Sequence, residues 1–223
     1  MALQFPKPIL YLITRGASKP STTSKSPEFQ TILTQIAAGV NAGIDLIQIR
    51  EKNLTARALF ELCERAAELT RESSTRLLIN DRADIARGAG ADGVHLTTQS
   101  IDAAMIRMTF GDDFLIGVST HSFAEARKAQ DESANFIVFG PIFETPSKQP
   151  YGPAVGLQRL SQTTSALVDF PVLALGGITI SNAQQCLSAG ASGIAGVSLF
   201  GNHDEIAEVA NAIKEGNSAR DEK

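Results

Sequence analysis

The sequence predicts an α/β protein, a single (β/α)8 TIM barrel, on three observations. Short apolar runs recur along the 223 residues at intervals that leave room for a helix between each pair. These runs are continuously apolar rather than alternating, as expected of parallel strands that helices cover on both faces. Polar and charged residues gather where the runs end, which is the face where such barrels hold their binding sites.

Eight runs are expected to be strands, in order residues 9–13, 46–49, 76–79, 93–96, 114–118, 136–139, 171–175 and 193–197. The segments between them carry helical periodicity, as Ala58, Leu62 and Ala66 show after the second run. The alternative is a doubly wound open sheet. That fold normally carries a glycine-rich phosphate fingerprint after its first strand, and residues 14–18, Thr-Arg-Gly-Ala-Ser, do not match it.

The composition is that of an ordinary globular chain. With 43% apolar and 20% charged residues it can bury a full core, so we expect one domain over residues 1–223, with a frayed polar tail at 216–223. The net charge of -4, without a long basic run, argues against nucleic acid or an anionic membrane as partner. Cys63 and Cys186 lie far apart in helical segments and are expected in the core.

The sequence also indicates where the protein works. It has no apolar signal region at its start and no apolar run long enough to span a membrane, so a cytoplasmic enzyme is expected. The oligomeric state stays open, a homo-oligomer included. Residues 16–27, rich in Ser, Thr and Lys, follow the first strand and are either a mobile lid or a tolerated surface insertion.

The end of the second strand carries the most informative pattern. Gln48, Arg50 and Lys52 alternate, and alternate residues of a strand point to the same side. Two cations at one strand end are costly to assemble unless an anion lies between them. A phosphorylated ligand is therefore expected there.

Other strand ends add donors and a candidate metal ligand. Lys148 could join Arg50 and Lys52 around a more highly charged group, and Asp81 offers a hard oxygen ligand for Mg²⁺. Asp81 could instead cap a helix or pair with Arg82.

A second anion site is expected after the last two strands. Gly176 and Gly177 let the backbone approach a phosphate closely, and loops at this position commonly hold one. The pair could equally form a tight turn before a helix that Ser181 or Asn182 caps.

Two histidines lie near strand ends. His95 is expected to be a packed, hydrogen-bonded core residue rather than a catalyst. His121 lies among Ser119, Thr120 and Ser122, where it could exchange protons, although Ser122 could simply cap the next helix ahead of Glu125.

With these residues in place, the sequence resembles the thiamine phosphate synthase and thiazole tautomerase family over nearly its whole length. The matching blocks, in order, are Gln48-Ile49-Arg50-Glu51-Lys52, Asn80-Asp81-Arg82-Ala83-Asp84, Gly93-Val94-His95-Leu96, Gly117-Val118-Ser119, Gly140-Pro141-Ile142-Phe143, Thr145-Pro146-Ser147-Lys148 and Gly176-Gly177-Ile178. Several blocks in the right order are far more specific than any one of them.

The resemblance implies a role for each block. The aminopyrimidine pyrophosphate would be contacted by Gln48, Arg50, Lys52, Asn80, Ser119 and Lys148. Asp81 would ligate Mg²⁺, and Arg50, Lys52 and Lys148 would stabilise the departing pyrophosphate. The thiazole phosphate would be bound by Thr145 and Ser147 and by backbone donors of Gly177, Val197 and Ser198. In this reaction pyrophosphate leaves the pyrimidine methylene and the thiazole nitrogen captures the carbocation.

One departure from the synthases concerns the metal. They usually continue after Gly93-Val94-His95-Leu96 with a run that ends in an aspartate, a second Mg²⁺ ligand, and here that position is Ser100. Mg²⁺ affinity should fall unless Asp84, Asp102 or the substrate compensates.

Two alternatives to the synthase remain. The tautomerases share the lost aspartate and use a histidine where His121 stands, but they tend to lose the residues kept here as Gln48 and Asp81. The protein could also be a non-catalytic paralogue that binds thiamine precursors. The synthase is the preferred interpretation.

Overall fold

The computed structural model describes residues 5–144 and 154–221, and within them it confirms the predicted barrel. Parallel strands β1 to β8 close into one sheet in chain order, with β1 paired to both β2 and β8. The strands are β1 Ile9–Ile13, β2 Leu46–Ile49, β3 Arg76–Asn80, β4 Gly93–Leu96, β5 Leu115–Thr120, β6 Phe136–Phe139, β7 Val172–Ala174 and β8 Gly193–Gly196. The helices are α1 Pro27–Asn41, α2 Ala56–Thr70, α3 Ala83–Gly88, α4 Ala103–Phe110, α5 Phe123–Asp131, α6 Gly156–Ala166, α7 Ile180–Ser188 and α8 Ile206–Asp221.

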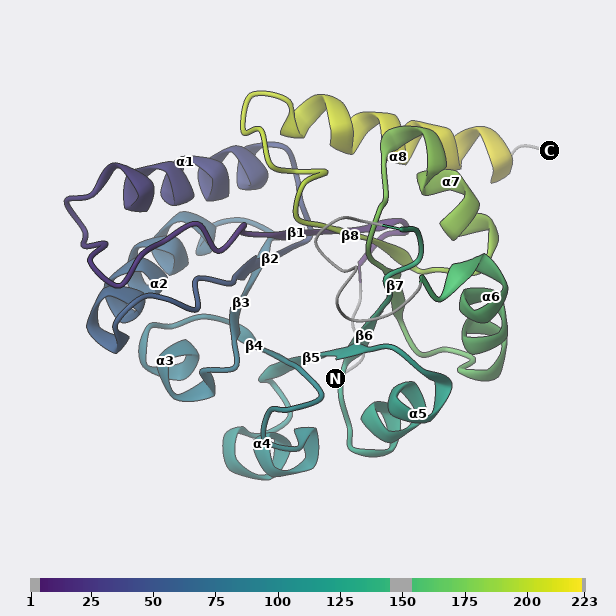
Figure 1. The fold of residues 1–223 in the computed structure, drawn as a ribbon, viewed down its shortest axis with the longest axis horizontal. Helices are drawn as coiled ribbons and strands as arrows, with labels where there is room; N and C mark the ends of the chain where they lie inside the picture. Colours follow the sequence, from purple (N-terminus) through teal and green to yellow (C-terminus); the bar gives the residue numbers. More distant parts are fainter. Residues whose placement is uncertain (1–4, 145–153, 222–223) are drawn as a thin grey trace.

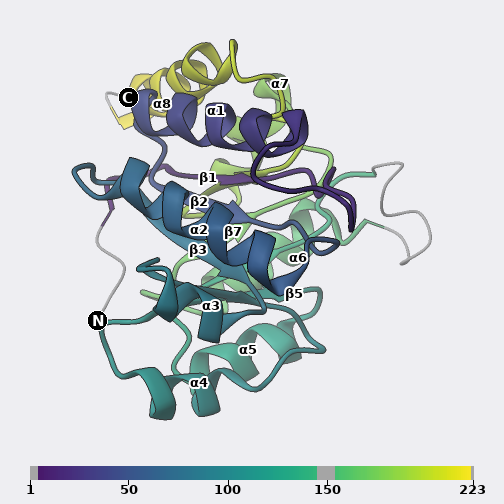
Figure 2. The same cartoon turned by 90° about the vertical axis from the view of Figure 1, so that its left-hand side faces the viewer.

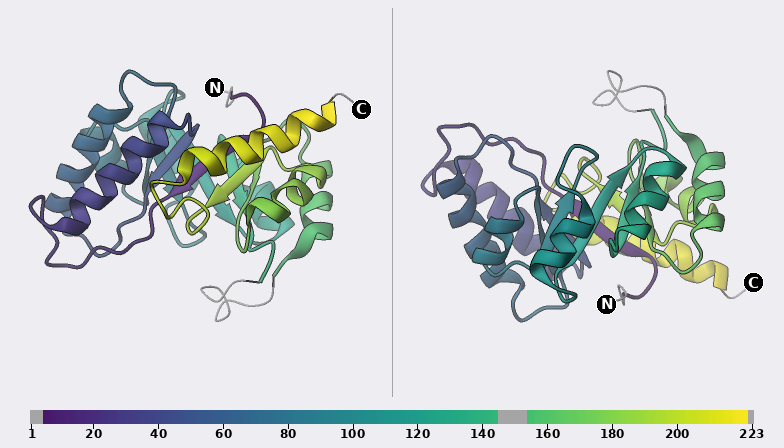
Figure 3. Two further views of the ribbon diagram at one scale, coloured as in Figure 1. Left: turned by 90° about the horizontal axis from the view of Figure 1, so that it is seen from above. Right: turned by 90° about the horizontal axis from the view of Figure 1, so that it is seen from below.

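The helices surround the strands in chain order (Figure 1). Helix α8 lies between the first and the last helices of the ring, and it contacts both α1 and α7 (Figure 3). Helix α8 runs to Asp221 and so includes backbone of the segment expected to be a polar tail. Every helix in the described ranges is too short or too polar to span a bilayer.

The apolar core has two layers. A large outer cluster lies between strands and helices and contains both Cys63 and Cys186, which are fully buried as predicted. A smaller inner cluster fills the barrel with alternate strand residues, among them Tyr11, Leu78 and Phe136. Alternate residues of each strand point into the barrel. The next inward-pointing residue after this cluster therefore lies two positions further along its strand, nearer one end of the barrel.

That end is the one at which the strands finish. In Figure 2 the chain enters β1 and leaves α8 on the same side of the molecule, while the segment between β1 and α1 lies on the opposite side. The first part of this segment is held in place, because the carboxylate of Glu51 accepts hydrogen bonds from the backbone N–H groups of Gly16 and Ser18, each at 3.0 Å. Ser18 and Thr22 are buried.

Four helix-to-strand connections share one local arrangement that the sequence analysis did not detect. Two residues past α1, α3, α5 and α7, a residue with positive φ turns the chain. A buried apolar residue follows, and then an Asp, Asn or Ser comes directly before the next strand. The four segments are residues 43–45, 90–92, 133–135 and 190–192.

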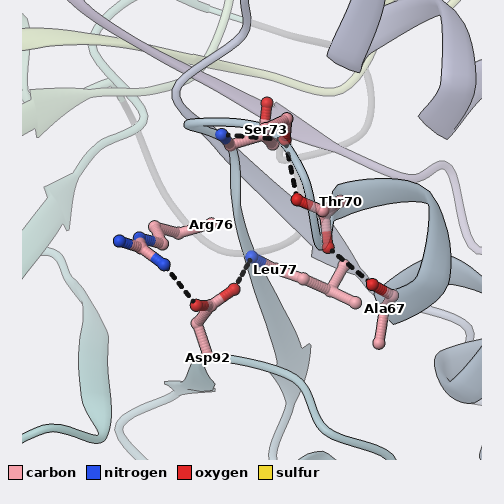
Figure 4. A network of polar contacts seen from close by, with 7 residues as sticks. Ala67, Thr70, Ser73, Arg76, Leu77 and Asp92 are labelled. Carbon is pink, nitrogen blue, oxygen red and sulfur yellow. Dashed lines mark hydrogen bonds and ion pairs between the residues drawn. The ribbon is translucent and has the colours of Figure 1, made fainter.

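In three of these corners the polar side chain ties two neighbouring strands together. The side chains of Asp45, Asp92 and Asn135 accept the backbone N–H of Leu10, Leu77 and Ile116, respectively, each at 2.8 Å. Figure 4 shows Asp92 between the Leu77 N–H and the Arg76 guanidinium, whose Nη1 lies 2.9 Å from its carboxylate. The end of the barrel where the strands begin is thus closed by hydrogen bonds that stabilise the sheet.

Candidate active site

The candidate site lies where the inner rows of the barrel reach the ends of β2 to β5. Gln48 follows Leu46 on the inner row of β2, and Asn80 follows Leu78 on β3. Both amides are buried, and Gln48 Nε2 donates to Asn80 Oδ1 at 3.2 Å. Both side chains therefore point into the barrel.

Beyond Gln48 the chain leaves the strand and carries its cations to the mouth of the barrel. The Arg50 N–H donates to Thr14 Oγ1 at 2.9 Å, which ties the ends of β1 and β2 together. The Arg50 guanidinium is half-buried and lies close enough to His95 to act on its pKa. Lys52 is exposed and makes no ion pair within the described residues.

Asp81 presents a carboxylate at the same mouth. Its φ of 59° turns the chain out of β3, a conformation that Asp tolerates better than most residues. Asn80 Nδ2 donates to Asp81 Oδ2 at 2.8 Å, and the Ser100 hydroxyl donates to Asp81 Oδ1. The Ser100 oxygen also accepts the Thr97 N–H at 2.7 Å, so Ser100 is oriented toward Asp81 by its own loop.

The two structural alternatives for Asp81 are both wrong. Helix α3 is preceded by Arg82 and has no side-chain cap. Arg82 pairs with Asp84 at 2.6 Å instead, which lowers the pKa of the Asp84 carboxyl. The Asp81 carboxylate is therefore available to a ligand at the mouth.

The donor set fits Mg²⁺ only as a substrate-assisted site. No group of three or more His, Cys, Asp or Glu side chains in the described residues could hold a metal by itself. Asp84 is paired with Arg82, and Asp102 is paired with Lys128 at 2.8 Å, so neither compensates for the aspartate that Ser100 replaces. Mg²⁺ often takes one or two carboxylates and completes its shell with water and substrate phosphates. Asp81 and the Ser100 hydroxyl meet that minimum.

The ends of β7 and β8 present free backbone donors. Gly176 and Gly177 have φ of 100° and 65°, and a Cβ on Gly177 would lie 2.7 Å from the Glu144 carbonyl oxygen. Within the described part of the chain, no hydrogen bond is donated by the N–H groups of Gly177, Val197 or Ser198. Three backbone N–H groups that have no acceptor among the described residues, at neighbouring strand ends, suit an anion.

The helix after this turn is capped differently from the prediction. Thr179, rather than Ser181 or Asn182, is the N-cap residue of α7, and Asn182 completes the capping box as its reciprocal partner. Asn182 Nδ2 also donates to the Gly177 carbonyl at 3.0 Å. The carbonyl of Gly177 is thus tied to α7 while its N–H stays available.

His121 directly follows β5, and its hydrogen bonds within the described residues are with the Gly140 carbonyl and Glu125 rather than with Gln48, Asn80 or Asp81. Its Nδ1 is 2.5 Å from the Gly140 carbonyl oxygen, and its side chain lines a cavity of about 470 Å³ between α5 and α6, together with Phe139 and Arg159. Ser122 caps α5 as expected, accepting the Glu125 N–H at 3.2 Å. A catalytic role for His121 stays a prediction.

Three predicted contacts cannot be placed, because Thr145, Ser147 and Lys148 lie outside the described residues.

The sequence analysis missed one residue of the site, Tyr11, and correctly predicted that another, His95, is packed and hydrogen-bonded. Tyr11 reads as one more apolar residue in a buried run, yet its hydroxyl lies 3.3 Å from Gln48 Oε1 and 3.1 Å from His95 Nδ1. His95 is buried and hydrogen-bonded as expected, and its Nε2 lies 2.9 Å from Ser119 Oγ. Tyr11 occupies an inner position of the first strand, as Gln48 does on the second, but its hydroxyl finds these partners only once the barrel closes.

Comparison with known proteins agrees with this geometry. The family described as thiamine monophosphate synthase matches residues 10–200. A putative thiamine-phosphate synthase of Geobacter sulfurreducens is 43% identical over 182 residues, which cover 82% of this chain and 85% of the relative. A thiamine-phosphate synthase of Chlorobium phaeovibrioides is 36% identical over 212 residues, covering 95% of each chain.

Solved structures give the same result. A thiamine phosphate pyrophosphorylase of Pyrococcus furiosus superposes with a TM-score of 0.78 at 28% sequence identity, covering 93% of this chain and 96% of the other.

Proposed function

The chain belongs to the thiamine monophosphate synthase family, and from this premise we propose that it is a transferase of thiamine biosynthesis. It joins hydroxymethylpyrimidine pyrophosphate to thiazole phosphate and releases pyrophosphate. The observation that supports this most is the convergence of Gln48, Arg50, Asn80 and Asp81 at one mouth, across from the free amides after β7 and β8. That arrangement offers separate places for two phosphorylated substrates.

The chemistry needs charge stabilisation rather than a protein nucleophile. The bond between the pyrimidine methylene carbon and the pyrophosphate oxygen breaks, and its electron pair leaves with pyrophosphate. The thiazole nitrogen then gives its lone pair to the methylene carbon and forms the new C–N bond. Arg50 at the mouth favours this departure, with Lys52 and Lys148 as the further cations assigned to the pyrophosphate, because cations preorganised around developing negative charge lower the barrier.

The amides after β7 and β8 position the second substrate. Backbone N–H groups of Gly177, Val197 and Ser198 bind the thiazole phosphate and hold the nitrogen near the cation, which saves the entropy of a bimolecular encounter. When bound at Asp81, Mg²⁺ would neutralise the leaving pyrophosphate. With Ser100 in place of a second carboxylate, Asp81 and the Ser100 hydroxyl would hold the ion, and the pyrophosphate and water would supply the remaining ligands.

The test is product formation from the two substrates. The purified chain is incubated with hydroxymethylpyrimidine pyrophosphate and thiazole phosphate, with Mg²⁺ or with a chelator, and thiamine phosphate is quantified. We expect metal-dependent product, and a loss of about 100-fold in kcat/KM in Arg50→Met. Arg57→Met is the matched control, because Arg57 is exposed on α2 and its one ion pair within the described residues is with Glu61. Tight binding of both substrates without turnover would contradict the proposal.

A further inference from the structure

Six polar side chains form one continuous hydrogen-bonded chain across the inside of the barrel. It involves five strands, β1 to β5, and runs from the mouth into the buried centre and back toward the mouth. Its members, in order, are Asp81, Asn80, Gln48, Tyr11, His95 and Ser119.

The direction of this chain is set at its first member. As a carboxylate, Asp81 can only accept, so the amide nitrogen of Asn80 donates to it at 2.8 Å. The amide oxygen of Asn80 then accepts from Gln48 Nε2 at 3.2 Å. This leaves the Gln48 oxygen, Oε1, facing the buried Tyr11 hydroxyl at 3.3 Å.

Tyr11 has one hydroxyl proton, so it can donate to Gln48 or to His95 but not to both. If its hydroxyl donated to His95, two oxygen acceptors would face each other in a buried site at Gln48, which is unfavourable. The Tyr11 proton therefore points to Gln48, and the Tyr11 oxygen accepts from His95 Nδ1–H across 3.1 Å. In a neutral imidazole Nε2 then carries no proton, so it accepts the hydroxyl proton of Ser119 across 2.9 Å.

The surroundings keep His95 fixed and uncharged. Its ring is flanked by Tyr11 and Phe136, with ring centroids at 5.6 and 6.0 Å. Gly117 leaves the space it needs, since a Cβ there would lie 2.7 Å from His95 Nδ1. Burial, and to a lesser extent the charge of Arg50, lowers the pKa of His95 to about 3.

We propose that Tyr11 and His95 are positioning residues that hold the Ser119 proton inward, so that Ser119 offers only an acceptor oxygen to the substrate. This rests on the proposed function. Phosphate oxygens are acceptors, so Ser119 in this orientation does not serve the pyrophosphate; it accepts the N–H of the pyrimidine amino group. Ser119 thereby selects the aminopyrimidine ring.

The proton position can be measured directly and without catalysis. The chain has three histidines, so nitrogen NMR of histidine-labelled protein can be assigned with His121→Gln and His203→Gln. We expect His95 to be neutral with its proton on Nδ1, and expect Tyr11→Phe to move that proton to Nε2. A proton on Nε2 in the unsubstituted protein, or no change in Tyr11→Phe, would overturn the proposal.

Kinetics test the consequence for the substrate. Tyr11→Phe and Ser119→Ala should each lower kcat/KM for the aminopyrimidine substrate roughly three- to tenfold, with the KM for thiazole phosphate unchanged. The double variant should lose no more than Ser119→Ala alone, because both changes remove the same acceptor. A double variant whose loss in kcat/KM equals the product of the two single losses would contradict the proposed coupling of Tyr11 to Ser119. Thr75→Val is the control, since it deletes a buried hydroxyl, bonded to the Ile44 carbonyl at 2.7 Å, at the other end of the barrel.

The identity of the recognised group is tested with the desamino pyrimidine pyrophosphate. Ser119→Ala should lower kcat/KM for the amino substrate and leave that for the desamino analogue unchanged. An equal loss with both would assign Ser119 to another part of the substrate and overturn this step. If the unsubstituted protein forms no thiamine phosphate at all, the proposed function fails, while the NMR measurement still decides the proton position.

Discussion

His95 shows how a barrel interior changes the behaviour of one side chain. Its ordinary pKa lies near 6.5, but burial favours the neutral form so strongly that the folded-state pKa falls to about 3. Between these two pH values His95 is protonated in the unfolded chain and neutral in the folded protein. Stability from this residue is therefore complete above about pH 6.5 and is lost as the pH falls toward 3.

The loss of stability toward low pH can be measured with a variant that lacks this histidine. The difference in unfolding free energy between the unsubstituted protein and His95→Gln should shrink as pH falls, by up to about 1.4 kcal/mol per pH unit between pH 6.5 and 3. Urea unfolding at four pH values in this window measures it, and carboxyl titrations common to both proteins cancel. A pH-independent difference would mean that His95 protonates in the folded state.

Ser100 allows a prediction about metal binding. In Ser100→Asp a second carboxylate is placed against Asp81, since the Ser100 hydroxyl already contacts that residue. Without metal the two like charges should lower Tm. The dissociation constant for Mg²⁺ should fall by about tenfold, because a second anionic ligand is added beside Asp81.

The neutral substitution Ser100→Asn is the control for this change, and it should show neither effect. Calorimetric titration with Mg²⁺ in the presence of pyrophosphate, and thermal unfolding with and without the ion, give both quantities. Equal Mg²⁺ affinity in Ser100→Asp and the unsubstituted protein would place the metal elsewhere.

At the scale of elements, the turn after β7 combines fold and function. Gly177 has φ of 65° and lies so close to the β6 loop that a Cβ would be 2.7 Å from both the Glu144 carbonyl oxygen and Phe143 Cβ. Gly177→Ala should therefore cost about 2–4 kcal/mol, combining left-handed strain and overpacking. It should also raise the KM for thiazole phosphate by displacing the Gly177 N–H.

Gly90 provides the matched control. It also has positive φ, 77°, but a Cβ there would meet nothing within 4 Å. Gly90→Ala should cost only about 1 kcal/mol of strain and leave both KM values unchanged. Urea unfolding and substrate kinetics on the two variants separate strain from crowding, and equal costs would mean that the β6 loop yields freely.

Elements were easier to predict from the sequence than the site. Buried strands give uninterrupted apolar runs, so positions such as Leu46–Ile49 were predicted with their observed bounds, whereas β5 continues to Thr120 because its polar end is still paired. Alternation also predicted that Gln48 points to the same side as Arg50 and Lys52. It could not predict that Tyr11 joins it, because a tyrosine in an apolar run shows its hydroxyl partner only after the barrel closes.

At the scale of the whole molecule, the two ends of the barrel separate binding from stability. The residues proposed to bind the substrates lie where the strands finish, and the corner residues that tie strand pairs lie where they begin. Asp92→Ala should cost about 1–3 kcal/mol, since it leaves the buried Leu77 N–H without its acceptor. The KM for each substrate should not change. A kinetic effect comparable to that of Arg50→Met would show that the two ends are coupled.

The repeated corner also predicts a stabilising change. Asp92 N–H and Asn135 N–H donate to the Leu77 and Ile116 carbonyls, and Ser192 N–H donates to Val172 in the same way, at 2.8 Å. The backbone is therefore equivalent, but Ser192 makes no side-chain bond to β7 within the described residues.

A longer acceptor should complete this fourth corner. In Ser192→Asn the amide oxygen can reach the Val172 N–H, as Asn135 reaches Ile116, which should raise the unfolding free energy by about 1 kcal/mol. Ser192→Ala, which adds no acceptor, should bring no gain. Because the corner lies at the end of the barrel opposite the substrates, kcat/KM should stay unchanged. A Ser192→Asn protein no more stable than Ser192→Ala in urea unfolding would show that the fourth corner differs in more than side-chain length.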